Sequence, residues 1–153
     1  GTNITSLTFK VFVRGDGNGT AWSHVNINAG DEWMLSLSLN TPVTLSGNVF
    51  NDANGLADNI VNGIGTNANN SLFVNLVDTA GKVVQSIGVN NNGTYSFNNV
   101  GEGNYTVILS TTQGTQGNTA PTASLPSGYV NTGENLGAGL GSDASINGVL
   151  PVK

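Results

Sequence analysis

Apolar residues alternate with polar ones over much of this chain, and this period-2 pattern constrains the fold more than any other feature. Two of the clearest runs are Leu7, Phe9, Val11 and Val13, and then Trp33, Leu35, Leu37 and Leu39. Successive side chains of a β-strand point to opposite faces, so such runs predict strands with one buried face. No long window keeps the apolar spacing of an amphipathic helix.

Further strands are predicted at residues 21–27, 43–50, 72–77, 82–89, 94–97 and 104–109, with weaker ones near Tyr129 and at 148–152. Clusters of Asn, Asp and Gly separate many of these runs and supply the backbone conformations that tight turns require. Short strands joined by such turns predict an all-β, antiparallel β-sandwich. Two longer connections, at 51–70 and 111–126, are candidates for functional loops.

Composition excludes several classes of protein. Charged residues make up only 8% of the 153, and the net charge is −5. Nucleic-acid binding needs clustered Lys and Arg, which this chain lacks. No apolar run has the ~20 residues of a membrane-spanning helix. The absence of cysteine removes disulfides, thiolate catalysis and Cys-ligated metal sites.

Several segments from Val43 onward carry a family signature. Residues 45–58 read LSGNVFNDANGLAD, residues 92–100 read NGTYSFNNV, residues 103–107 read GNYTV, and residues 126–129 read PSGY. Together they resemble the B-type repeats of bacterial serine-aspartate-repeat adhesins. The G-x-Y-x-F…G-x-Y-x-V part is similar to collagen-binding-type B domains and carboxypeptidase-regulatory-like domains as well. The resemblance covers residues 43–153.

The resemblance implies an Ig-like or prealbumin-like β-sandwich that serves as a non-enzymatic structural or adhesive part of a secreted, cell-surface protein. Residues 43–153 would form this sandwich, and residues 1–42 would add N-terminal strands. Repeats of this family usually close with one more strand beyond the region where this chain stops. The N-terminal strands would then either complete the chain's own sheet or be donated to a neighbouring subunit.

Strand donation predicts self-association into a homopolymer, because a head-to-tail contact that does not close on itself makes a filament. The candidate donor segment is marked by Ile4, Leu7, Phe9, Val11 and Val13. The other expected partners are neighbouring modules of a surface protein, or a glycan or host-cell ligand.

A candidate metal site lies in the 51–70 loop. Asp52, Asn54 and Asp58 place three oxygen-bearing side chains at relative positions 1, 3 and 7 around Gly55. Calcium takes six to eight oxygen ligands from flexible loops. The adhesin repeats that this chain resembles bind calcium at this point, although the late bidentate Glu of their loop is missing here. The alternative is a turn in which Asp52 and Asn54 bond local backbone amides.

Catalysis has little support in the sequence. His24 is the only histidine, no nucleophile elbow occurs, and the nine carboxylates are scattered. The rival to a structural role is a ligand-binding module, in which Trp22, Trp33 and Tyr129 would stack on sugar rings. Four Asn-x-Thr sequons are candidates for glycosylation, at Asn3, Asn18, Asn92 and Asn104.

Overall fold

The computed structural model describes residues 42–137, 139 and 141–153. The strand-donation residues Ile4, Leu7, Phe9, Val11 and Val13 lie outside this range. The described elements, in chain order, are β1 (Val43–Asn48), β2 (Phe50–Asn51), the 3-10 helix η1 (Gly55–Asp58), β3 (Ile64–Gly65), β4 (Phe73–Val77), β5 (Val83–Gly88), β6 (Thr94–Val100), β7 (Tyr105–Ser110) and β8 (Val149–Val152).

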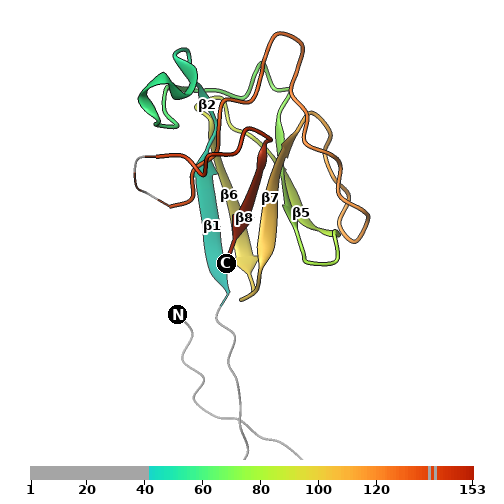
Figure 1. Ribbon diagram of the computed structural model, residues 1–153. Helices are drawn as coiled ribbons and strands as arrows, with labels where there is room; N and C mark the ends of the chain where they lie inside the picture. The colour runs from blue at the N-terminus through green and yellow to red at the C-terminus, as the bar shows by residue number, and fades with distance from the viewer. Residues whose placement is uncertain (1–41, 138, 140) are drawn as a thin grey trace, which may run out of the picture. The chain divides into compact units, whose positions relative to one another are not determined.

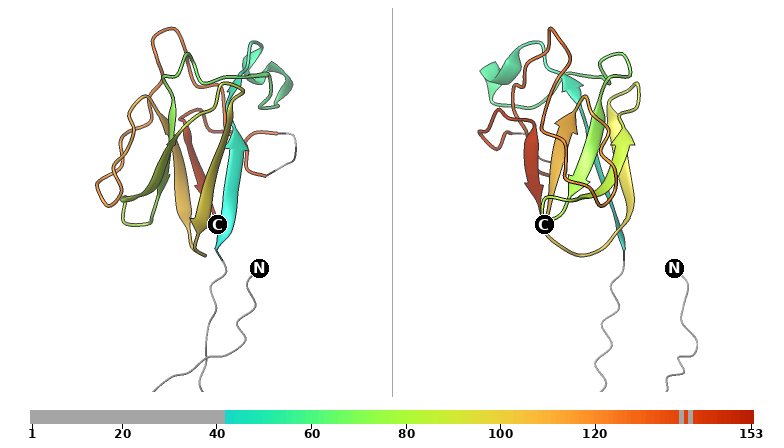
Figure 2. Two further views of the ribbon diagram at one scale, coloured as in Figure 1. Left: turned by 180° about the vertical axis from the view of Figure 1, so that it is seen from behind. Right: turned by 90° about the vertical axis from the view of Figure 1, so that its right-hand side faces the viewer.

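The strands form antiparallel sheets only, so the prediction of an all-β fold is confirmed for the described part. One sheet has the order β5-β4-β7-β8, a second pairs β1 with β6, and a short third pairs β2 with β3. Figures 1 and 2 show the first two sheets layered against each other. The weak strand predicted near Tyr129 is wrong. That residue ends a turn in which its N–H donates to the carbonyl of Pro126 at 3.1 Å.

The core lies between these two sheets and follows the alternation of the sequence. Leu76 on β4 and Phe97 on β6 are both fully buried, and Val107 on β7 packs in the same cluster. Tyr95 meets Phe97 edge-on, with ring centroids 5.9 Å apart and planes at 63°. This is a favoured geometry for aromatic pairs. The Tyr-x-Phe signature is therefore a packing motif.

A bulge interrupts the pairing of β1 with β6. Leu45 stands opposite Phe97, but Val43 stands opposite Val100, so β6 carries one extra residue here. In this stretch Asn99 has a φ of 56°, in the left-handed region that Asn tolerates better than most residues. Such bulges bend a strand and increase its twist.

The two ends of the sandwich differ. Figure 1 shows that β1 begins and β8 ends at the same end, while η1 and the Asn-rich turns lie at the other. Gly93 is required in one of these turns. Its φ is 82°, and a Cβ there would lie 2.2 Å from the carbonyl oxygen of Val49.

Candidate functional site

The predicted metal loop folds as a compact turn followed by η1. The N–H of Gly55 donates to the carbonyl of Asp52 at 3.3 Å, and Gly55 takes a φ of 57°. Glycine reaches this left-handed conformation at little steric cost. The turn therefore depends on the Gly that follows the first two predicted ligands.

Asp58 is held by groups of its own loop. Its Oδ2 accepts hydrogen bonds from the side-chain amides of Asn54 at 3.1 Å and Asn62 at 3.2 Å, and its Oδ1 accepts from the N–H of Ile60 at 3.0 Å. The Asn54 amide, and then the Ile60 N–H, lower the pKa of this exposed carboxyl below its ordinary value of 3.8. Two of the predicted ligands, Asn54 and Asp58, are thus already hydrogen-bonded to each other.

Asp52 behaves differently. Both of its carboxylate oxygens are buried, and neither has a hydrogen-bond partner among the described residues. Buried carboxylates are normally paired, hydrogen-bonded or bound to a metal, because leaving them bare is costly. The Asx turn, in which this side chain bonds a backbone amide, is therefore not what the structure contains. Both carboxylate oxygens of Asp52 can therefore still accept a hydrogen bond or bind a cation.

The structure brings Asn54 and Asp58 together by a direct hydrogen bond, but Asp52 is not bonded to either. Among the described residues, no three His, Cys, Asp or Glu side chains cluster as a metal-binding group. A cation at this loop would therefore use Asp52 first. It would take amide and backbone oxygens, and would compete for Asp58 with the amides that now hold it.

Glu134 is a second carboxylate with an unpartnered buried oxygen, and no sequence pattern pointed to it. Its Oε1 accepts from the backbone N–H groups of Asn147, at 3.2 Å, and of Gly148, immediately before β8. Its Oε2 is buried without a partner. Burial raises the pKa of Glu134, and the negative charge of Asp143 adds to that effect. No spacing motif marks Glu134, because the groups it binds are thirteen and fourteen residues away.

The other long loop is fixed to the sheet below it. Asn75, which is fully buried on β4, accepts at Oδ1 from the hydroxyl of Ser86 at 2.7 Å and from the N–H of Gly114 at 2.8 Å. Its amide also donates to the carbonyl of Thr112 at 3.3 Å. In the sequence, the signal for this anchor is an Asn in the middle of an apolar strand, and the pattern of alternation did not identify it.

Serine hydroxyls secure the same loop at its ends. Ser110, fully buried at the end of β7, lies within 3.0 Å of the hydroxyl of Ser124 and donates to the carbonyl of Thr122 at 2.9 Å. The N–H of Thr111 donates to Ser124 at 3.0 Å. The buried polar groups in this region therefore hold the 111–126 loop in place.

The remaining predicted residues fall in two groups. Trp22 and Trp33, like Asn3 and Asn18, lie outside the described residues, so the proposed row of aromatics stays a prediction. Tyr129 is 39% exposed.

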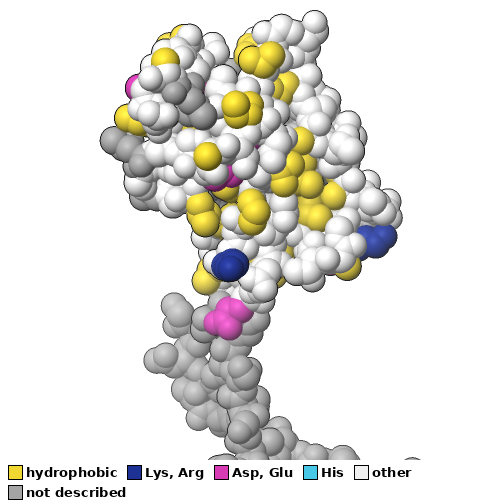
Figure 3. Space-filling model, in the orientation of Figure 1, with side chains coloured by type: hydrophobic (Ala, Val, Ile, Leu, Met, Phe, Trp, Pro, Cys, Tyr) yellow, Lys and Arg dark blue, Asp and Glu magenta, His cyan; other side chains and the backbone are white. Residues whose placement is uncertain are grey.

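Two of the predicted sequons lie within the described residues. Asn92 accepts from the N–H and the hydroxyl of Thr94 in its own sequon, at 3.2 and 2.7 Å, and Asn104 is exposed. Figure 3 shows few charged side chains on the face it presents.

Comparison with known proteins does not assign the chain. No family model, no curated protein and no solved structure matches it. Within the described part of the chain, no helix has the length and apolar character needed to cross a bilayer.

Proposed function

We propose that this chain is a non-enzymatic structural or adhesive building block of an extracellular assembly, either a cell-surface protein or a self-assembling filament. The position of the two sandwich ends carries the proposal. The polypeptide enters β1 and leaves β8 at the same end, as Figure 1 shows. η1 and the Asn-rich turns lie at the opposite end of the sandwich.

Polar side chains cross-link the end that carries the Asn-rich turns. Asn67 is buried, and its amide donates to Asn70 at 2.9 Å and to Asn91 at 2.7 Å, which ties two turns together. Satisfied networks of this kind rigidify a surface. A firm end suits a spacer or an adhesive tip. The resemblance of residues 43–153 to adhesin B-type repeats supports the same function.

We also propose that this function uses calcium at the 51–70 loop. Asp52, with its buried and unpartnered carboxylate, would supply the first ligand, and Asn54 and Asp58 would supply further oxygens. A bound calcium ion would cross-link the loop through several oxygens. Gly55 allows the turn that carries these side chains.

Antibodies against the purified chain provide the test of location. They should label intact cells of the producing organism without permeabilisation, and protease added outside the cells should remove the label. Labelling that appears only after the cells are opened would exclude an extracellular role.

A further inference from the structure

The four-stranded sheet has two outer edges, and each is protected over part of its length. Alongside β5, the N–H of Val83 donates to Asn118 at 2.9 Å, the N–H of Gly117 donates to Val83 at 2.8 Å, and the N–H of Ala120 donates to Gly81 at 3.0 Å. The 111–126 loop therefore covers the start of this edge, alongside residues 81–83, as an additional strand would. Covering an edge in this way prevents pairing with other chains.

The edge at β8 lacks free donors. The N–H of Leu109 donates to the carbonyl of Gly148, so Gly148 and Leu150 turn their backbone groups toward β7, while Val149 and Pro151 turn theirs away. The N–H of Val149 is already bonded to the side chain of Asn147 at 2.8 Å. Pro151 has no N–H. Proline on an edge strand is a common protection against pairing.

The outer edge of β1 has no such protection. Thr94 uses its N–H and carbonyl within its own turn, so it does not exchange hydrogen bonds with Asn48 opposite. By the alternation of an antiparallel ladder, Ser46 and Asn48 then direct their N–H and carbonyl groups away from β6. No other described residue bonds to these four groups. The strand also contains no charged residue and no proline.

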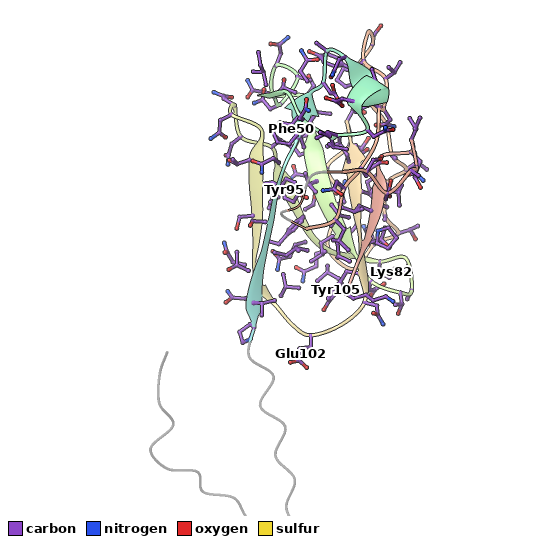
Figure 4. The ribbon with its side chains drawn as sticks, turned by 60° about the vertical axis from the view of Figure 1, so that its left-hand side comes forward. Phe50, Lys82, Tyr95, Glu102 and Tyr105 are labelled. Carbon is purple, nitrogen blue, oxygen red and sulfur yellow. The ribbon has the colours of Figure 1, made fainter. Side chains whose placement is uncertain are left out.

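The open edge borders an incompletely covered side of the core. Leu45 on β1 and Leu150 on β8 pack against the core but remain partly exposed. Figure 4, turned to bring this side forward, shows β1 in front, with strands of the four-stranded sheet behind it and β8 farther to the right. A strand added to β1 would cover these apolar side chains while satisfying the free backbone groups.

We propose that the outer edge of β1 is a strand-acceptor site and that its occupant is the segment Ile4–Val13 of a second copy of this chain. In a strand, the alternating residues Leu7, Phe9, Val11 and Val13 would share one face and would turn toward the uncovered core. The proposal rests on the structural function above, because it supplies the contact by which building blocks join.

The chain is long enough for this exchange. Residues 14–42 separate the donor from β1, and 29 extended residues span up to roughly 100 Å. A strand the length of β1 is only about 20 Å long. Each copy would donate at one site and accept at another, and a head-to-tail contact of this kind grows into a filament when it does not close on itself.

The test separates donor from acceptor. Ser46→Pro removes one outward N–H from β1 without breaking a bond to β6, so the fold should be retained. A chain lacking residues 1–14 keeps the acceptor edge and has no donor. Light scattering after size exclusion should show polymers for the wild type and monomers for each variant alone. Mixing the two variants should give a 1:1 heterodimer that grows no further.

Two controls protect this reading. Val149→Pro removes an outward N–H from the protected β8 edge and should leave polymerisation unchanged. Asn48→Pro repeats the block at β1 in case Ser46→Pro disturbs folding, and circular dichroism melting curves check both proteins. Polymers that persist in folded Ser46→Pro and Asn48→Pro would overturn the acceptor site and leave the proposed function standing. A wild-type chain that stays monomeric would overturn the exchange itself, and surface labelling would still decide the location.

Discussion

The two long loops of the described sandwich are both polar, but they are held in place in different ways. The 111–126 loop is bonded to the strands beneath it through Asn75, Ser86 and Ser110. The 51–70 loop is held around η1 mainly by its own side chains, and it leaves the carboxylate of Asp52 bare. A polar loop becomes a fixed part of the fold where a strand supplies a buried partner.

The same difference separates structural from functional polar groups. A buried side chain whose bonds are all made contributes stability and little chemistry. A buried group with bonds still to make is costly in the bare protein, and it gains when a ligand arrives. We therefore expect substitutions that release the 111–126 loop to lower the free energy of unfolding under all conditions. The effect of substitutions in the 51–70 loop on stability should depend on cations and pH.

The largest effect is expected at Asn75. Asn75→Ala leaves the N–H of Gly114, the hydroxyl of Ser86 and the carbonyl of Thr112 without this partner, and it opens a cavity. Unsatisfied buried groups cost about 1–3 kcal/mol each, so we expect a loss of about 2–4 kcal/mol in the free energy of unfolding. Urea titration measures this value.

The matched control is Asn98→Ala, an exposed position on β6 whose side chain accepts only from Thr44 at 3.2 Å. Exposed substitutions of this kind usually change stability by less than about 0.5 kcal/mol. Equal losses for the two variants would show that the 111–126 loop is not anchored through Asn75.

The second effect is the gain in stability that we expect when calcium binds the 51–70 loop. Extracellular calcium modules bind with dissociation constants of about 0.1–1 mM. At tenfold excess over that constant, binding adds about 1.4 kcal/mol to the free energy of unfolding. Asp52→Asn should abolish this gain, and without calcium it should stabilise the protein by removing a bare buried charge. Differential scanning calorimetry with and without calcium measures both effects.

The control for charge is Glu102→Gln, which removes one negative charge from an exposed turn. This variant should keep the calcium response. A response that survives Asp52→Asn, or one that is lost in Glu102→Gln, would contradict the assignment of the cation to the 51–70 loop.

A third effect concerns Glu134, the other carboxylate with a bare oxygen. Its pKa is raised from 4.5, mainly by burial, so the folded state favours the protonated form. Its contribution to stability is therefore present at low pH and is lost as pH rises through the raised pKa. Glu134→Gln keeps an oxygen for Asn147 and Gly148 and cannot ionise. Its stability relative to the wild type should be greater at pH 7 than at pH 4, as urea titrations at both values would show, and the opposite trend would refute the assignment.

The smallest effect is expected at Asp58, which is fully exposed. The Asn54 amide and other donors lower its pKa, so the stability it contributes is present above about pH 3.8 and lost as pH falls. Asp58→Asn should lower the midpoint temperature slightly at pH 6 and leave it unchanged at pH 2.5. A difference that persists at pH 2.5 would point to altered packing of η1 in place of lost charge.

Much of the fold could be predicted from the sequence, because strands of this kind are specified by local alternation. The range 104–109 predicted β7 to within a residue, and 72–77 did the same for β4. The candidate site was harder to predict from the sequence. Asp52, Asn54 and Asp58 were identified by spacing, but spacing does not say which carboxylate keeps a free bonding site. Glu134 was missed because its partners are distant in sequence.

By itself, the sequence determined that the described chain is all-β, where most strands lie, and that Tyr95 and Phe97 share a face. These properties follow from a period of two and from turn residues, which act over a few positions. Only the tertiary structure decided that the edges at β5 and β8 are protected in part while β1 is open, and that the carboxylate of Asp52 is buried without a partner. Edge closure and desolvation depend on which distant segments meet, and local patterns do not encode those meetings.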